Sequence, residues 1–132
     1  MATKDRITCH VLNTQTGRPA ASVQVRLESL STSTPRTFES RTDDDGRVKA
    51  WLPYSGARSS GEVPLYTLDD VIAELDDGGK GSRWVLTFDT GAYFGEGNTF
   101  FPEVAVTFTM GEGHHHVPLL LAPYSYTTYR GS

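Results

Sequence analysis

Several features that identify particular protein classes are missing from this sequence. Cys9 is the only cysteine, so no disulfide can form within the chain, and a reducing compartment is expected. No apolar run approaches the length of a membrane span, and the N-terminus lacks the apolar segment of a secretory signal. The formal net charge of -4, without a cluster of lysines and arginines, argues against a nucleic-acid partner. We therefore expect a cytoplasmic protein that binds neither nucleic acid nor membrane.

What remains is the composition of an ordinary globular protein. Apolar residues make up 37% of the chain and charged residues 21%, which is typical of a folded domain. A length of 132 residues is enough for one domain with its own core. We expect a single domain over residues 1–132.

The pattern of apolar residues predicts a protein made mainly of β-strands. Short segments with period-two alternation or strand-like apolar runs lie at 6–12, 23–28, 37–41, 47–52, 83–88, 103–109 and 117–122. The turn sequence Asp-Asp-Asp-Gly at 43–46 joins two of them and predicts a hairpin of 37–41 with 47–52. Strands of this length, separated by turn signals, are typical of an all-β, two-sheet antiparallel β-sandwich.

One helix is predicted in the middle of the chain. Leu68, Val71, Ile72 and Leu75 follow the i, i+3, i+4, i+7 spacing of an apolar helix face. Thr67 precedes them and can serve as the N-cap.

Polar chemistry is concentrated at the end of the chain. Tyr129, Arg130, Gly131 and Ser132 place an aromatic ring, a guanidinium, a flexible glycine and a hydroxyl directly after a predicted strand. Chain ends usually fray and tolerate change, so this concentration is unusual for a terminus. We interpret it as part of a functional site that includes the terminal α-carboxylate.

The histidines and one arginine are candidates for the same site. His10 lies on the polar face of its predicted strand, and an isolated histidine there is most often a solvated surface residue. In the run 114–116, alternation lets only His114 and His116 share a face. Arg47 follows the turn, where an arginine is usually a solvated charge or the partner of a nearby carboxylate; it could also bind a planar, oxygen-rich ligand through two hydrogen bonds.

Two other kinds of site have little support. A zinc site needs three or four ligands, yet Cys9 and His10 point to opposite faces, and no H-E-x-x-H or paired-cysteine motif is present. A serine hydrolase is also poorly supported, because there is no G-x-S-x-G turn. Composition and pattern alone therefore predict a soluble β-sandwich with a histidine-rich, polar C-terminal site.

The order of five segments carries a more specific signal. They are ITCHVLNTQTGRPA at 7–20, DDDGR at 43–47, LTFDTGAYF at 86–94, FFPEVAVTF at 100–108 and HHHVPLLLAPYSYTTYRGS at 114–132. This arrangement resembles the 5-hydroxyisourate hydrolases of the transthyretin-like family, and the terminal Tyr-Arg-Gly-Ser is its most specific part.

The resemblance implies a fold, an assembly and a reaction. It implies a transthyretin-like sandwich in a homotetramer, built as a dimer of dimers with active sites between the dimers. The implied reaction is the metal-free hydrolysis of 5-hydroxyisourate to 2-oxo-4-hydroxy-4-carboxy-5-ureidoimidazoline in urate degradation, with no cofactor. Related enzymes are cytosolic or peroxisomal, and neither end of this chain has a clear import signal, so a cytoplasmic location remains the expectation.

The resemblance also assigns roles to individual residues. His10 and His116, as matches to the family histidines, are expected to activate water and move its proton. Arg47 is expected to bind substrate oxygens and stabilise negative charge. Tyr129, Arg130 and Gly131 are expected to bind the substrate, with Tyr129 lining the pocket. Arg130 and the catalytic Ser132 are expected to orient the cluster.

Three departures from the family pattern stand out. The segment at about 55–82, which contains the predicted helix, is longer than usual and is interpreted as an insertion. The link around 91–103 is short, so the small helix that the family has there is expected to be curtailed. His115 stands where the family has an aromatic residue between its two histidines. A non-catalytic carrier of small ligands is the main alternative within this fold, although a carrier needs none of the histidine and arginine groups.

Overall fold

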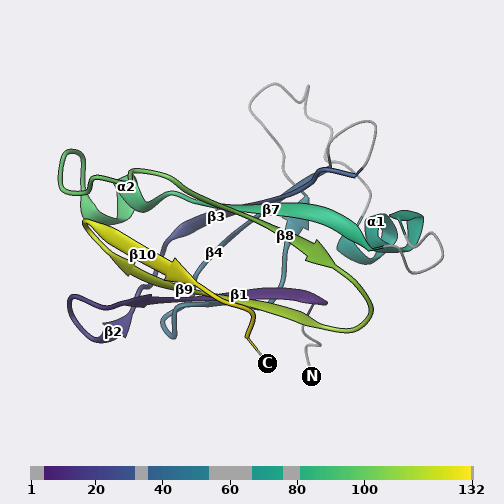
Figure 1. The fold of residues 1–132 in the computed structure, drawn as a ribbon, viewed down its shortest axis with the longest axis horizontal. Helices are drawn as coiled ribbons and strands as arrows, with labels where there is room; N and C mark the ends of the chain where they lie inside the picture. Colours follow the sequence, from purple (N-terminus) through teal and green to yellow (C-terminus); the bar gives the residue numbers. More distant parts are fainter. Residues whose placement is uncertain (1–4, 32–35, 54–66, 76–80, 132) are drawn as a thin grey trace.

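The computed structural model describes residues 5–31, 36–53, 67–75 and 81–131 (Figure 1). Ser132 and most of the expected insertion at 55–82 lie outside the described residues. The insertion therefore remains a prediction, although the helix within it is described.

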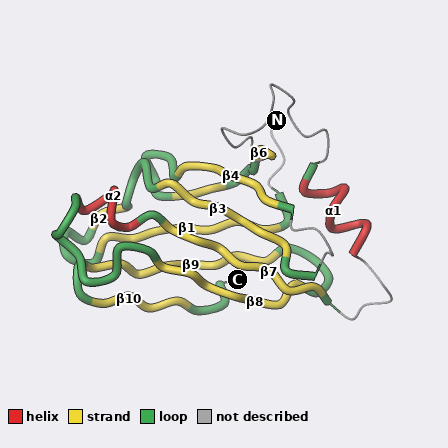
Figure 2. The backbone as a smooth tube through the Cα atoms, turned by 90° about the horizontal axis from the view of Figure 1, so that it is seen from above, coloured by secondary structure: helices red, strands yellow, loops and turns green. Residues whose placement is uncertain are grey.

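The strands form two layers that lie over one another (Figures 1 and 2). The first sheet has the order β10-β9-β1-β2, and β5 also pairs with β1. Its strands are β1 (Ile7–Asn13), β2 (Arg18–Pro19), β5 (Arg47–Val48), β9 (His115–Ala122) and β10 (Ser125–Thr128). The second sheet has the order β6-β4-β3-β7-β8. Its strands are β6 (Leu52–Pro53), β4 (Thr37–Arg41), β3 (Gln24–Ser29), β7 (Ser82–Phe88) and β8 (Val104–Met110). The expected two-sheet β-sandwich is confirmed.

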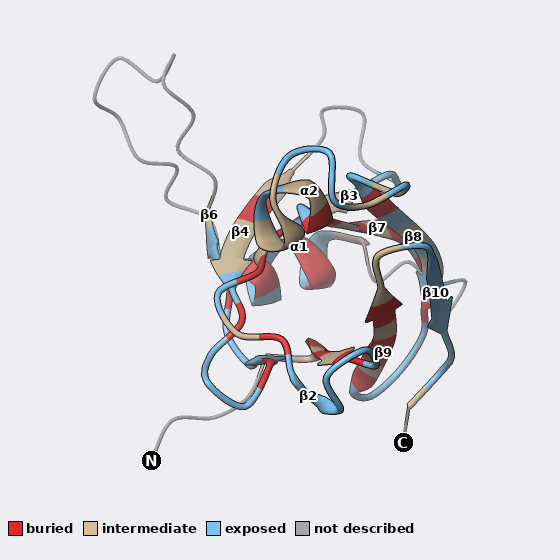
Figure 3. Cartoon of the chain, turned by 90° about the vertical axis from the view of Figure 1, so that its left-hand side faces the viewer, coloured by how far each residue is buried: buried red, intermediate tan, exposed pale blue. Residues whose placement is uncertain are grey.

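The core lies between the sheets, as the alternating pattern requires. In β1, Ile7, Cys9 and Val11 are fully buried, and Trp84 and Phe88 of β7 are fully buried in the opposite layer. Figure 3 shows buried stripes of this kind along β9. Each large apolar side chain buried in this way contributes about 1.5–3 kcal/mol. Because the odd-numbered residues of β1 face the core, its even-numbered residues face outward on the same sheet.

Helix α1 (Leu68–Leu75) confirms the predicted amphipathic helix. The Thr67 hydroxyl accepts a hydrogen bond from the Asp70 backbone N–H at 3.2 Å, and the Asp70 carboxylate accepts one from the Thr67 N–H at 2.9 Å. This reciprocal capping satisfies two backbone donors at the helix N-terminus. Val71 and Ile72 are buried against the sandwich, so α1 extends the core at the end opposite α2 (Figure 1).

Three details differ from the sequence-based expectation. Residues 47–52 do not form one strand that pairs with 37–41: β5 pairs with β1, and β6 pairs with β4. The turn itself forms, because the Gly46 N–H donates to the Asp43 carbonyl at 2.9 Å, but the chain after it crosses from one sheet to the other. The sandwich is also not wholly antiparallel, because β1 and β9 run parallel.

The described residues contain a second helix, α2 (Thr90–Phe94), where a curtailed helix was expected. The Asp89 carboxylate caps it by accepting a hydrogen bond from the Ala92 N–H. Neither helix is long and apolar enough to cross a membrane.

Candidate active site

The strand register brings three of the predicted residues to one place. His10 of β1 is the direct pairing partner of Arg47 of β5, so the crossover after the turn places the guanidinium beside this histidine. Along the parallel β1–β9 pair, His116 lies opposite Thr8. The His10 and His116 rings face each other, with centroids 6.4 Å apart and planes inclined by 28°. Residues more than 100 positions apart in the chain thus share one outer face of the first sheet.

His114 continues this row of rings, and a buried hydroxyl joins it to His116. The two ring centroids are 6.4 Å apart, with planes inclined by 18°. Thr8 Oγ1 lies 3.0 Å from His114 Nε2 and 2.7 Å from His116 Nδ1. His115 is buried, and its Nε2 accepts a hydrogen bond from the Gly111 N–H at 3.2 Å. His114 and His116 therefore converge and His115 does not, which is the only convergence that strand alternation allowed.

The C-terminal segment of the chain contacts His116. β10 runs antiparallel to β9, and beyond it the Gly131 N–H donates to the His116 carbonyl at 2.9 Å. A Cβ at position 131 would lie 2.7 Å from His116 Cδ2 and 3.0 Å from Pro118 Cγ. Only glycine leaves enough room for the chain to approach the imidazole so closely. Ser132, a predicted catalytic residue, lies outside the described residues.

A hollow of about 220 Å³ opens beside these residues. It is lined by Thr8, Cys9, Arg47, Val48, Lys49, His114 and His116. Arg47 and Lys49 are exposed and give the hollow a positive charge that suits an anionic or oxygen-rich ligand. Sequence reasoning missed Thr8 and Lys49; the even-numbered alternation along β1 is the signal that could have pointed to Thr8.

Tyr129 and Arg130 line a different hollow. Its volume is about 230 Å³, and it lies between β8 and the C-terminal segment, with Phe108, Val117 and His115 among its other walls. His116 borders both hollows. The structure therefore brings Gly131 next to His116 but places Tyr129 and Arg130 on the neighbouring hollow, and their contact with substrate remains a prediction.

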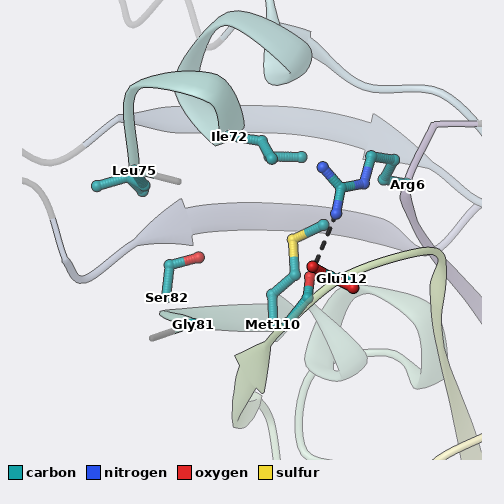
Figure 4. A pocket seen from close by; sticks show the side chains of 8 residues that line it. Arg6, Ile72, Leu75, Gly81, Ser82, Met110 and Glu112 are labelled. Carbon is teal, nitrogen blue, oxygen red and sulfur yellow. Dashed lines mark hydrogen bonds between the residues drawn. The ribbon is translucent and has the colours of Figure 1, made fainter. Parts of the chain in front are cut away.

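Arg6 fixes the turn that precedes the histidine run. Its Nε donates to the Gly113 carbonyl at 3.1 Å, and its Nη2 donates to the Gly111 carbonyl at 3.2 Å. The same side chain borders a small hollow of about 50 Å³ beneath Ile72 of α1 (Figure 4). The first sheet, the turn and α1 thus meet at Arg6, another residue that the sequence pattern did not single out.

The electrostatic environment favours an unprotonated His10. Burial lowers its pKa, and the positive charge of Arg47 lowers it further. Burial and the Arg130 guanidinium likewise lower the pKa of His115. Burial raises the pKa of the Cys9 thiol, so this cysteine is not a thiolate nucleophile at neutral pH.

The described residues include no group of three or more histidine, cysteine or acidic side chains arranged to hold a metal ion. What they do bring together is neutral imidazole beside a guanidinium. An imidazole can take a proton from water at neutral pH, and a guanidinium can stabilise an oxyanion that forms next to it. This combination suits hydrolysis of a carbonyl compound.

Comparison with known proteins gives a consistent result. Residues 7–131 match the family model described as the HIUase/Transthyretin family. A protein of Schizosaccharomyces pombe named probable 5-hydroxyisourate hydrolase is 38% identical over 133 residues, covering 96% of this chain and 90% of that protein.

Two solved structures have the same fold. The 5-hydroxyisourate hydrolase of Klebsiella pneumoniae matches with a TM-score of 0.62 and 29% identity, over 96% of this chain and 98% of that one. Sea bream transthyretin in complex with thyroxine matches with a TM-score of 0.69 and 23% identity, over 96% and 95% of the two chains. The match to the family model and the identity to a full-length relative together show that the chain belongs to the HIUase/Transthyretin family.

Proposed function

We propose that the protein hydrolyses 5-hydroxyisourate to 2-oxo-4-hydroxy-4-carboxy-5-ureidoimidazoline, a step of urate breakdown in purine metabolism. The observation that carries this proposal is the convergence of His10, His116 and Arg47 on one face of the first sheet. Relatives named 5-hydroxyisourate hydrolase, such as the protein of Deinococcus radiodurans with 38% identity over 96% of this chain, support the choice of substrate.

The proposed chemistry gives each of these side chains a step. His116, assisted by His10, takes a proton from a water molecule as its oxygen attacks the ring carbonyl carbon. The carbon–nitrogen bond then breaks, and the departing nitrogen receives a proton from the imidazolium. Arg47, with Lys49 nearby, stabilises the oxyanion that forms between these steps. A general base and an oxyanion donor each contribute about 10²-fold or more to the rate.

The C-terminal segment completes the site in this proposal. Gly131 holds the chain against His116. Ser132, the next residue in the sequence, is assigned the orientation of the catalytic groups in this proposal. Tyr129 and Arg130 approach the substrate from the neighbouring hollow. No metal and no cofactor take part.

The assembly belongs to the same proposal. We expect a cytoplasmic homotetramer, a dimer of dimers with the sites between dimers. β8 and β10 are edge strands of the described sheets, and a strand edge of this kind can pair with another copy of the chain. Light scattering coupled to size-exclusion chromatography tests this: four chains per particle is the expected result, and a monomer would contradict it.

A matched pair of arginines tests the reaction. Both Arg47 and Arg18 are exposed on short strands that pair with β1, but only Arg47 lies beside His10. Turnover of freshly generated 5-hydroxyisourate, corrected for its spontaneous decay, should fall about 10²-fold or more in Arg47→Gln and remain at the wild-type level in Arg18→Gln.

Two results would contradict the proposal. If Arg47→Gln and Arg18→Gln are equally active, Arg47 has no specific role in the reaction. Binding of the substrate by the wild type without any turnover would favour the carrier function instead.

A further inference from the structure

The hydroxyl of Thr8 is placed between two histidines and is shielded from solvent. Thr8 is only 3% exposed, although it lies on the outward-facing side of β1. Its Oγ1 is within hydrogen-bond distance of His116 Nδ1, at 2.7 Å, and of His114 Nε2, at 3.0 Å. Threonine on a β-strand is common and needs no functional reason, but a buried hydroxyl that links two imidazoles is a specific arrangement.

A hydroxyl carries one proton, and this limits the two contacts. It can donate to only one of the neutral imidazole nitrogens, and it must accept a hydrogen bond from the other. At most one of the two facing nitrogens can therefore lack a proton, because the hydroxyl has one proton to donate but two lone pairs that can accept. The tautomers of the two rings are coupled through the direction of this single O–H bond.

One of the possible arrangements fits the proposed role of His116. Its Nδ1 is the nitrogen that contacts Thr8, so Nε2 is the ring nitrogen left to meet water. If His116 takes a proton from water, as proposed above, Nε2 must start without one. The neutral ring then carries its proton on Nδ1 and donates it to Thr8. The Thr8 hydroxyl is left to donate to His114 Nε2.

We propose that Thr8 is a positioning residue that fixes His116 in the tautomer with its proton on Nδ1, and that His114 holds the Thr8 hydroxyl in the required orientation. This inference rests on the proposed hydrolysis, because the choice among the possible arrangements uses the role of His116 as a base. Thr8 touches no reacting atom in this account, and it acts only through His116. The sequence left the role of His114 open; here His114 orients the Thr8 hydroxyl.

Hydrogen bonds of the neighbouring backbone hold the strand segments that carry Thr8, His114 and His116. The parallel pairing of β1 with β9 places Thr8 directly opposite His116, and the His115 N–H donates to the Arg6 carbonyl at 2.7 Å. Arg6 also holds the carbonyls of Gly111 and Gly113, which fixes the turn before His114. These contacts fix the backbone positions from which Thr8, His114 and His116 extend their side chains.

The test compares Thr8→Val with Thr8→Ser in the full-length protein, after removal of an N-terminal tag. Valine has nearly the shape of threonine but has no hydroxyl, whereas serine keeps the hydroxyl. Nitrogen-15 NMR of labelled histidines, at a pH about two units above the ordinary histidine pKa of ~6.5, reports which ring nitrogen carries the proton. The kcat for 5-hydroxyisourate is measured on the same samples, and circular dichroism verifies that each variant is folded.

The wild type should show His116 protonated on Nδ1. Thr8→Val should show a mixture of tautomers at His116 and a kcat about tenfold lower, as expected for the loss of one orienting hydrogen bond. Thr8→Ser should restore the single tautomer and most of the kcat. If Thr8→Val keeps the Nδ1 tautomer, or keeps the wild-type kcat in an active enzyme, the role assigned to Thr8 is refuted.

The tautomer measurement does not depend on turnover, so the two proposals can fail separately. A wild type that does not hydrolyse 5-hydroxyisourate, with tautomers that still respond to Thr8→Val, would support the hydrogen-bond assignment and refute only the hydrolase. If Thr8→Val is unfolded, the tautomer of His116 in the wild type and in Thr8→Ser tests the proposal. His116 protonated on Nε2 in either of these proteins would overturn the proposal.

Discussion

Replacement of Gly131 by alanine should impair turnover while leaving the fold intact. The new methyl group would lie 2.7 Å from His116 Cδ2, about 0.7 Å closer than the ~3.4 Å at which ordinary contact begins. Pro118 Cγ, at 3.0 Å, and the His116 carbonyl, at 3.2 Å, block the obvious ways to relieve this clash. Either the imidazole or the C-terminal segment must therefore move by several tenths of an ångström.

A displacement of this size is costly in an active site. A catalytic group misplaced by about 1 Å can lose a factor of about 10² in rate, which corresponds to about 2.7 kcal/mol of transition-state stabilisation. We expect kcat/KM for 5-hydroxyisourate to fall about 10- to 100-fold in Gly131→Ala. The melting temperature should change little, because position 131 is outside the core.

Gly111 supplies a matched control for this substitution. It lies in the turn that leads to the same histidines, but a Cβ built there meets nothing within 4 Å. Gly111→Ala should therefore keep the wild-type kcat/KM, measured from the ultraviolet absorbance decay of freshly generated 5-hydroxyisourate. Full activity in Gly131→Ala, or an equal loss in both variants, would refute the steric role given to the C-terminal segment.

Three further predictions concern the chain end, the helix and the response to acid. One alanine added after Ser132 should lower turnover at least tenfold without unfolding the protein, because the terminal carboxylate proposed to orient the catalytic groups would be moved to another residue. Full turnover would refute the role given to the terminus. Ile72→Ala should destabilise the protein by about 2–3 kcal/mol in chemical denaturation, because Ile72 is buried where α1 packs on the core, whereas the exposed Ala73→Ser should have an effect within about 0.5 kcal/mol. An equal effect of the two would mean that α1 does not pack on the core. The unfolding free energy should decrease as pH falls from about 7 to 5: the pKa values of His10 and His115 are lowered in the folded state, so the unfolded chain binds more protons in this range. His115→Phe should make this decrease shallower, and an unchanged slope would show that His115 does not contribute to it.

Much of the fold could be predicted from local sequence alone. The alternation in β1 correctly separates the buried Ile7, Cys9 and Val11 from the outward-facing His10, because a strand directs successive side chains to opposite faces. The spacing of apolar residues and the position of Thr67 also located α1, because helix caps and helix faces are encoded within a few residues.

Strand pairing was harder to predict, because it depends on distant parts of the chain. The turn before Arg47 looks like a hairpin locally, yet β5 pairs with β1 because the crossover connects the two sheets. The parallel β1–β9 pair joins the two ends of the sequence, and no local pattern specifies its register.

The same limitation explains which site residues were found. The residue pattern made His10, Arg47 and the pair His114 and His116 candidates. The family resemblance then selected His116 and supplied the catalytic roles, which remain predictions. Thr8 is an ordinary strand residue until the β1–β9 register places its hydroxyl between His114 and His116. Its role depends on that spatial arrangement, which the one-dimensional pattern does not contain.

The most direct test of the proposed function is the ultraviolet decay of freshly generated 5-hydroxyisourate with the wild type and with His116→Ala. The spontaneous reaction is subtracted, and circular dichroism shows that both proteins are folded. We expect decay well above the spontaneous rate with the wild type and a loss of about 10²-fold or more in the variant. Decay no faster than in buffer with the folded wild type, or full activity in the variant, would contradict hydrolysis by His116.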